Sequence, residues 1–180
     1  MQERSRMGTK WFLDTGNSFV GFAVKHYGIN FVKGLFTKFV VNLEFDPDDF
    51  LSIRIQATID ATSINTTNAR RDLDLQEPDY LDTEKYPEII FVSSRVEQIS
   101  DKRFHLTGDL TIKNVTREVL LDVSYGGTSK DPKGIQHLGF SAEATINRKD
   151  VHLTAHTPLP TGNVMVADEV RIMLDVELRE

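Results

Sequence analysis

Two histidines with metal-ligand spacing are the first residues to consider as reactive groups. His152 and His156 are four apart, which would place both imidazoles on one face of a helix or of a strand. The residues between them include no glutamate, so the helical pattern of zinc proteases is absent. Pro158 and Pro160 follow closely and disfavour a helix in this segment. We therefore expect no metal site and no other cofactor, and at most a weak surface site for a cation.

Catalytic motifs are also absent from the sequence. None of the 180 residues is a cysteine, which removes disulfides, thiolate ligands and thiol nucleophiles together. The Gly-x-Ser-x-Gly elbow, the phosphate-binding glycine loop and the dinucleotide fingerprint do not occur. Acidic pairs such as Asp48/Asp49 and Asp72/Asp74 lie in polar stretches, where solvation or helix capping is their ordinary role. We expect a protein that is not an enzyme, with a lipid-directed hydrolase or isomerase as the lesser alternative.

Three polar residues could meet the head group of a ligand. His26 ends an apolar run and could donate a hydrogen bond at the mouth of a pore, or be an ordinary structural histidine near a turn. Arg71, beside Asp72, and Arg148 carry guanidinium groups that match phosphate and carboxylate geometry. Each arginine could equally anchor local structure through ion-paired hydrogen bonds. For Arg71 and Asp72 we favour the anchor.

Aromatic side chains are concentrated between Phe19 and Phe50. In the run from Ser18 to His26 both alternating faces are largely apolar, which is more than a sheet with one wet face requires. Pockets for apolar ligands are lined mainly by such side chains, although packing of a filled core would use them as well. We predict that the ligand-binding residues are Val20, Phe22, Val24, His26, Phe31, Phe36, Phe39, Arg71, Phe91 and Arg148.

The elements that would position these residues show a period of two. Between Leu51 and Asp60 the apolar Ile53, Ile55, Ala57 and Ile59 alternate with polar residues, which is typical of a half-buried strand. Similar runs cover Ser18 to His26, Phe39 to Phe45, Ile89 to Val96, Arg103 to Ile112, Arg117 to Tyr125, Gly139 to Asn147 and Val170 to Leu178. With Lys10 to Asp14 they make about eight or nine strands, near the number at which a barrel closes around one small ligand.

Turn residues separate these runs at short intervals. Asp46 to Asp49 divides two of them, and Lys113-Asn114 forms a two-residue hairpin turn in which asparagine would tolerate the positive φ. Such spacings favour antiparallel pairing. The polar stretch from Asn65 to Gln76 predicts a short helix that begins between Thr66 and Asn68. The predicted fold class is all-β: an eight-stranded antiparallel β-barrel with a short helical insertion.

Length and charge narrow the remaining classes. The 180 residues predict a single domain over residues 1–180, with residues 1–9 as a loosely ordered N-terminal extension. The net charge of −6 and the lack of a Lys/Arg run argue against a nucleic-acid partner. No segment has the ~20 apolar residues of a membrane span, so no integral membrane association is expected. As written, the N-terminus has no secretory apolar region and predicts a cytoplasmic protein; an export signal removed beforehand would make it periplasmic or extracytoplasmic.

Motifs spread over nearly the whole chain resemble the YceI-like family of bacterial lipocalin-like barrels. They include Trp11 with Asp14, the run from Ser18 to His26, Lys33-Gly34-x-Phe36-x-Lys38-Phe39, Glu44-Phe45-Asp46-Pro47, Thr67-x-x-x-Arg71-Asp72, Gly108-Asp109-Leu110-Thr111-Ile112, Gly139-Phe140-Ser141 and Asn147-Arg148-Lys149-Asp150. The resemblance implies an eight-stranded barrel with a helical insertion and an elongated interior that binds polyisoprenoid or other long-chain lipids. It also implies a binding protein without enzymatic activity, and homodimers occur in the family.

Two segments depart from the pattern of that family. Asp74 stands where the helical motif of the family usually has histidine. After Asp150 the family commonly has aromatic residues, whereas this chain has Val151 to His156, with two histidines. We expect this second segment to border the pore and to change ligand size or head-group preference.

Together these patterns predict a protein that binds, sequesters or transports a long apolar lipid, either an isoprenoid or a fatty-acid-like molecule. The first alternative is a filled barrel that acts as a stress-related or protein-interaction module. The second is an enzyme that acts on an isoprenoid or acyl lipid.

Overall fold

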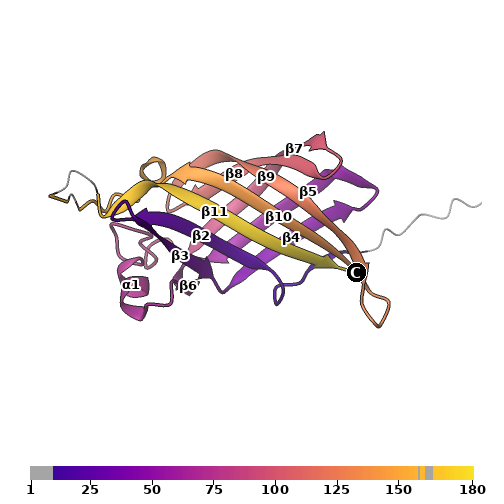
Figure 1. Ribbon diagram of the computed structural model, residues 1–180, viewed down its shortest axis with the longest axis horizontal. Coiled ribbons are helices and arrows are strands. Elements are labelled where there is room, and N and C mark those ends of the chain that lie inside the picture. The colour runs from indigo at the N-terminus through magenta and orange to yellow at the C-terminus, as the bar shows by residue number, and fades with distance from the viewer. Residues whose placement is uncertain (1–9, 158, 161–163) are drawn as a thin grey trace, which may run out of the picture.

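An antiparallel sheet accounts for most of the computed structural model, which describes residues 10–157, 159–160 and 164–180 (Figure 1). The expectation about residues 1–9 lies outside the described residues. The strands are β1 (Phe12–Leu13), β2 (Phe19–His26), β3 (Asn30–Phe36), β4 (Phe39–Asp46), β5 (Asp49–Asp60), β6 (Ile64–Asn65), β7 (Glu88–Ser100), β8 (Arg103–Ile112), β9 (Val115–Lys130), β10 (Gln136–Asn147) and β11 (Val166–Arg179).

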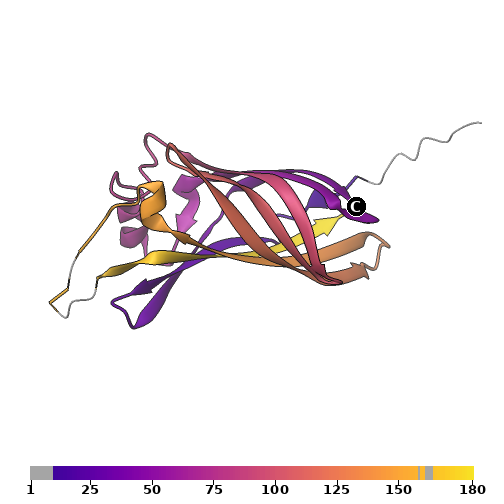
Figure 2. The same ribbon diagram turned by 90° about the horizontal axis from the view of Figure 1, so that it is seen from above.

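The sheet follows the order β4-β5-β7-β8-β9-β10-β11-β2-β3-β6, and β1 pairs with β11. It curls into an elongated half-barrel (Figures 1 and 2). Strand β4 is at one edge of the sheet and β3 is next to the short β6 at the other, yet only Thr37 and Lys38 separate β3 from β4 in the chain. The short connection from β3 to β4 therefore links the two edges of the sheet, although no pairing between β3 and β4 is found in the described residues. The predicted all-β, antiparallel architecture is confirmed.

The strand number differs from the predicted eight. The sheet has eleven strands, of which β1 and β6 have two residues each. The sequence prediction missed β3, which pairs with β2 from Gly21↔Leu35 to His26↔Asn30. Its alternation is broken by Gly34 on the inner face, where a Cβ would lie 2.4 Å from the tip of the Phe22 ring. Because this inner position is a glycine that makes room for the Phe22 ring, the apolar alternation of β3 is interrupted in the sequence.

Local sequence explains the other elements. All four apolar residues of the alternating run in β5 face the interior: Ile53, Ile55, Ala57 and Ile59. The two-residue turn between β8 and β9 is confirmed by the Ile112↔Val115 pair, but the positive φ of 57° belongs to Lys113 rather than to Asn114.

Short helices cover one end of the half-barrel. The predicted helical insertion is confirmed as α1 (Ala69–Asp74), whose N-cap Asn68 accepts a hydrogen bond from the Arg71 backbone N–H. The 3-10 helices are η1 (Ala61–Ser63) and η2 (Arg148–Val151). Near α1 the Ala155 N–H donates to the Asp79 carbonyl at 3.0 Å, which ties the segment after η2 to the segment after α1. We call this the helical end; it also holds the turn between β2 and β3 (Figures 1 and 2).

Candidate functional site

An apolar cavity of about 330 Å³ lies inside the half-barrel. This volume is at the lower end of the range for small-molecule pockets, roughly 300–1,000 Å³. Inward side chains from most strands line it, including Leu43 on β4, Ile55 on β5, Leu106 on β8 and Ile172 on β11. Their alternation along each strand was visible in the sequence, although these residues were not among the predicted binding residues.

Polar groups are sparse along the cavity. Apart from apolar residues and a glycine, its described lining residues are Ser18, Tyr80, Ser141 and Arg148. No carboxylate or imidazole is among these described residues. The Ser18 Oγ already accepts a hydrogen bond from the Glu177 N–H at 3.0 Å. Within the described residues no group of three or more His, Cys, Asp or Glu side chains could hold a metal. The cavity can therefore remove a hydrocarbon chain from water.

Packed aromatic rings line the cavity at the end opposite the helices. The Phe50 ring lies 5.4 Å from Phe45, 5.5 Å from Phe104, 5.2 Å from Tyr125 and 6.0 Å from Phe140, measured between ring centroids. Such distances are those of well-packed aromatic pairs. We call this cluster the aromatic end.

At the helical end the cavity is lined by residues from separate segments. Leu75 follows α1, Tyr80 lies in the connection to β7, Leu153 follows η2, and Val166 begins β11. Leu153 belongs to the segment that departs from the family pattern, and its place in the lining agrees with the expectation that this segment borders the pore.

Most of the predicted binding residues lie together around this cavity. They are Val20, Phe22, Val24, Phe36, Phe39, Phe91 and Arg148. Their contact with a ligand stays a prediction. Phe31, by contrast, is not part of the lining: it pairs with Lys25 on the outer face of the hairpin, and it is 51% exposed. The pairing register sends it outward, because alternate residues of a strand face opposite sides.

His26 also lies outside the cavity lining, at the last position of β2. It pairs with Asn30 across the hairpin and with Val166 on β11. Its ring centroid is 4.1 Å from that of Tyr27. It follows Val24, the last lining residue of β2, by two positions on the same face, and lies beside Val166, which also lines the cavity. Its role at the mouth of the pore and its alternative as a structural histidine both stay predictions.

Arg71 and Asp72 form the anchor that we favoured. The Arg71 Nε donates to Thr66 Oγ1 at 2.8 Å, and its Nη2 donates to the Thr66 carbonyl at 3.0 Å. Asp72 accepts from the backbone N–H of Thr66 at 2.8 Å and from its hydroxyl at 2.6 Å. Both side chains thus hold α1 against Thr66, the residue that follows β6, and Arg71 is not among the lining residues.

Arg148 reaches the cavity wall, but its guanidinium is engaged by the protein. Its side chain is 3% exposed. Nε donates to the Ala167 carbonyl at 3.0 Å, Nη1 to the Leu153 carbonyl at 2.7 Å and Nη2 to the Val166 carbonyl at 3.3 Å. Asp168 completes the cluster, 3.3 Å from Nη2. Arg148 is therefore an anchor that ties η2 to β11 at the helical end.

The ionised side chain of Asp168 makes the stability of this cluster depend on pH. The hydrogen bond from the Lys149 side chain, 2.8 Å away, lowers the pKa of Asp168 below its ordinary value, against the opposing effect of burial, and the charges of Lys149, Arg148 and His156 add to the lowering. A carboxylate with a lowered pKa stabilises the folded state above its unfolded pKa, and this contribution is lost as pH falls through the folded pKa.

Asp168→Asn is accordingly expected to lower the melting temperature at about pH 7. Below about pH 4 the difference in melting temperature between this variant and the parent protein should become smaller. Thermal melts over this pH range measure both effects. Glu169→Gln on the adjacent exposed position is the control and should change little. A deficit of Asp168→Asn that stays constant down to about pH 3 would contradict the ionic role of Asp168.

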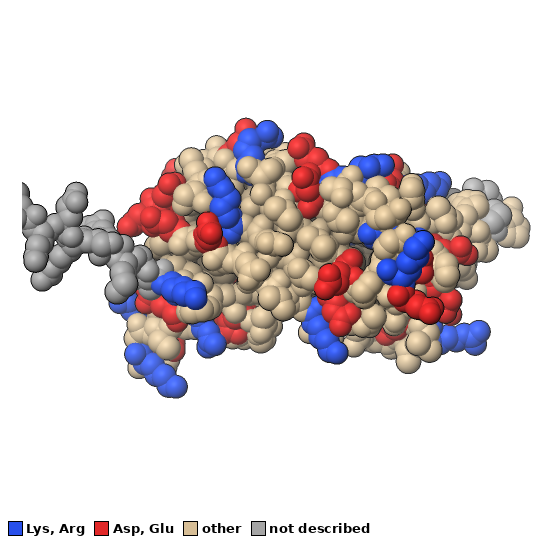
Figure 3. Space-filling model, turned by 180° about the vertical axis from the view of Figure 1, so that it is seen from behind, with Lys and Arg blue, Asp and Glu red and all other residues tan. Residues whose placement is uncertain are grey.

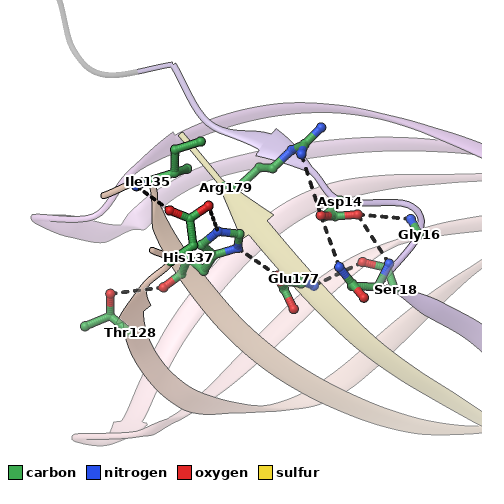
Figure 4. A network of polar contacts seen from close by, with 10 residues as sticks. Asp14, Gly16, Ser18, Thr128, Ile135, His137, Glu177 and Arg179 are labelled. Atoms are coloured by element: carbon green, nitrogen blue, oxygen red, sulfur yellow. Dashed lines mark hydrogen bonds and ion pairs between the residues drawn. The ribbon is translucent and has the colours of Figure 1, made fainter. Parts of the chain in front are cut away.

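A polar network that the sequence prediction missed lies near the C-terminus (Figure 4). The His137 Nδ1 is 2.7 Å from a Glu177 carboxylate oxygen, and its Nε2 is 3.7 Å from Asp131. Burial acts to raise the pKa of Asp131, but the backbone N–H groups of Ile135 and Lys133, together with His137, hold that pKa below its ordinary value. The network joins the β9–β10 turn to β11. No sequence signal pairs His137 with Glu177, which is 40 positions away.

Comparison with known proteins agrees with this geometry. The YceI-like domain matches residues 11–178. The chain belongs to the YceI-like family. A UPF0312 protein of Staphylococcus aureus (strain MSSA476) is 36% identical to the chain over 170 residues, which cover 94% of this chain and 96% of the relative.

Solved structures share the fold of this YceI-like chain. The Campylobacter jejuni YceI protein is 33% identical with a TM-score of 0.74, covering 96% of this chain and 98% of that one. Burkholderia cenocepacia BcnA is 25% identical with a TM-score of 0.79, covering 92% and 99%. A polyisoprenoid binding domain from Saccharophagus degradans, 17% identical with a TM-score of 0.63 and coverage of 93% and 97%, shares the fold alone. Across the described part of the chain, no helix combines the length and apolar character of a membrane span.

Proposed function

We propose that this YceI-like protein binds one long apolar lipid chain, isoprenoid or fatty-acid-like, inside the half-barrel and sequesters or transports it unchanged. The observation that carries the proposal is the apolar cavity that extends from the aromatic end to the helical end. Each buried methylene contributes about 0.8 kcal/mol, so about ten of them supply roughly 8 kcal/mol before the entropic costs of binding. A long chain can thus bind with few polar contacts.

The chemistry of the lining favours binding over turnover. In the part of the lining that the structure describes there is no carboxylate, imidazole or thiol, and the guanidinium of Arg148 donates to backbone carbonyls. The shared fold with a polyisoprenoid binding domain makes a polyprenyl chain the first ligand class to test, with an acyl chain beside it. A cytoplasmic location and pairing into homodimers stay predictions.

The test begins with native mass spectrometry of protein purified from its host, followed by solvent extraction and titration with fluorescent polyprenyl and acyl probes. We expect a co-purified lipid and saturable binding of at least one probe. If no lipid co-purifies and the extracted, folded protein binds neither probe, the proposal fails.

Ala142→Trp is expected to weaken probe binding by at least about tenfold. Ala142 lines the cavity between Leu174 on β11 and Val123 on β9, so an indole there fills space that the ligand needs. Glu143→Trp, one position along and exposed, is the matched control and should keep its affinity within about twofold. Ala57→Phe gives a second interior filling, and circular dichroism confirms folding of each variant. Unchanged affinity in both folded interior variants would exclude this cavity as the binding site.

A further inference from the structure

The turn between β2 and β3 presents three large apolar side chains to solvent. Tyr27 is 44% exposed, Ile29 is 77% exposed and Phe31 is 51% exposed. All three lie within five consecutive residues, and we call them the hairpin tip. Scattered apolar residues on a surface need no explanation, but a group on one protruding element indicates a contact surface.

The backbone conformation at Tyr27 is unfavourable for a residue with a large side chain. Tyr27 has a φ of 53°, in the left-handed region, where glycine or asparagine is the ordinary occupant. Hydrogen bonds from the Tyr27 N–H to the Met165 carbonyl (2.9 Å) and from the Ile29 N–H to the His26 carbonyl (3.1 Å) hold the turn in place. Tyr27 contacts the His26 ring but leaves 44% of its surface exposed, and an exposed aromatic residue kept at an unfavourable φ favours a role in contact with a partner.

Basic residues lie behind the hairpin tip on the same outer face. Lys25 pairs with Phe31, and Lys33 and Arg171 pair with Ala23 from its two sides. The Arg171 guanidinium lies 5.7 Å from the centre of the Phe31 ring. The segment 19–36 contains no acidic residue, although the whole chain carries a net charge of −6.

Charges of opposite sign are mixed over other parts of the surface. On the face opposite to the view of Figure 1, acidic and basic side chains intermingle (Figure 3). Near the hairpin, β11 contributes the exposed Glu169 as well as Arg171. The three cations behind the tip therefore outnumber this acidic neighbour, so the local charge complements an anionic surface.

The hairpin tip is close to one end of the cavity. Val24 on β2 and Val166 on the neighbouring β11 both belong to the lining, and Val166 pairs with His26, the residue before Tyr27. The opposite end of the cavity is lined by the packed rings of the aromatic end. A surface that touches the hairpin tip therefore lies near the helical end of the cavity.

We propose that the hairpin tip docks this protein on an anionic lipid bilayer. Tyr27, Ile29 and Phe31 enter the interfacial region, while Lys25, Lys33 and Arg171 approach the anionic head groups. This inference rests on the proposed function, because docking brings the helical end of the cavity to a source or an acceptor of lipid. A bilayer is the favoured occupant because the apolar tip is small and cations stand directly behind it.

Co-sedimentation with vesicles tests the proposal. We expect the full chain to sediment with phosphatidylcholine–phosphatidylglycerol vesicles, more weakly with phosphatidylcholine alone, and less as the salt concentration rises. The tip variant Tyr27→Asn/Ile29→Ser/Phe31→Thr should lose at least about tenfold in vesicle affinity, and Lys25→Gln/Lys33→Gln should lose a similar factor on anionic vesicles only. In Ile29→Trp, the fluorescence of the added indole should shift to the blue on anionic vesicles, because the indole enters the interfacial region of the bilayer. Trp11 is buried and supplies a constant background.

A matched control removes exposed apolar side chains elsewhere. Val92→Ser/Ile99→Ser/Leu120→Ser alters residues that are 43%, 52% and 46% exposed, and its vesicle affinity should stay that of the parent. The proposal is overturned if the parent protein binds neither kind of vesicle, or if the tip variant binds as well as the parent. It is also overturned if the tip variant changes the molecular mass in solution, since the tip would then be a contact between copies of the chain. The tip variant should keep the affinity of the parent for the lipid probe in the absence of vesicles. Vesicle affinity therefore tests docking, and probe affinity tests lipid binding separately.

Discussion

Arg148→Met is expected to lower the free energy of unfolding by about 3–5 kcal/mol. The methionine would fill much of the same space along the cavity wall, but it would leave the carbonyls of Leu153, Val166 and Ala167 without their donor. It would also leave Asp168 without one of its two cationic partners. Buried polar groups that lose a partner carry the full penalty of desolvation, which is why the loss exceeds the value of an average hydrogen bond.

Lys149→Met is the control that separates the loss of the buried guanidinium from the loss of one positive charge beside Asp168. Lys149 contacts the same Asp168 from a side chain that is 51% exposed, so its removal should lower the free energy of unfolding by at most about 1 kcal/mol. Urea unfolding of both variants provides the comparison. A loss below about 1 kcal/mol for Arg148→Met would mean that water replaces the guanidinium at these carbonyls. Arg148 would then have no anchoring role, and its head-group role would return as the explanation.

The sequence was sufficient to predict elements whose pattern is local. In β5 the apolar residues recur at every second position without interruption, so both the strand and its inward face could be read directly. The helix α1 was predictable because Asn68 is a strong N-cap and no β-branched run follows it. The same alternation on β2 placed Val20, Phe22 and Val24 on one face, and these residues line the cavity.

Other features depend on partners that are distant in the chain. Whether Phe31 faces inward is decided by the register of β3 against β2, and the turn that sets this register places Tyr27 at an unfavourable φ. Arg148 bonds to residues 18 and 19 positions away. The sequence could rank an anchor against a head-group site for such residues, but only the tertiary arrangement shows which carbonyls surround a guanidinium.

Gly108→Ala is expected to lower both stability and lipid affinity, since Gly108 is buried on the inner face of β8. A Cβ at this position would lie 2.4 Å from the tip of the Phe91 ring and 2.6 Å from the Val92 carbonyl oxygen. The ring can move only toward the cavity that it lines, and the carbonyl belongs to a paired strand that cannot move freely. Such overpacking costs about 1–3 kcal/mol, and the displaced ring should weaken probe binding by several-fold.

Gly139→Ala is the matched control for this prediction. Gly139 also lies in a strand, but nothing lies within 4 Å of a Cβ built there, so this variant should be neutral or slightly more stable. The double variant Gly108→Ala/Phe91→Leu should lose less stability than the sum of its two single changes, because the smaller side chain removes the clash that the added methyl creates. Thermal unfolding and probe titration of all four proteins measure the coupling. Strict additivity would show that the Phe91 ring does not meet the new methyl group, and that the shape of the cavity near β8 is set by the backbone contact with Val92 alone.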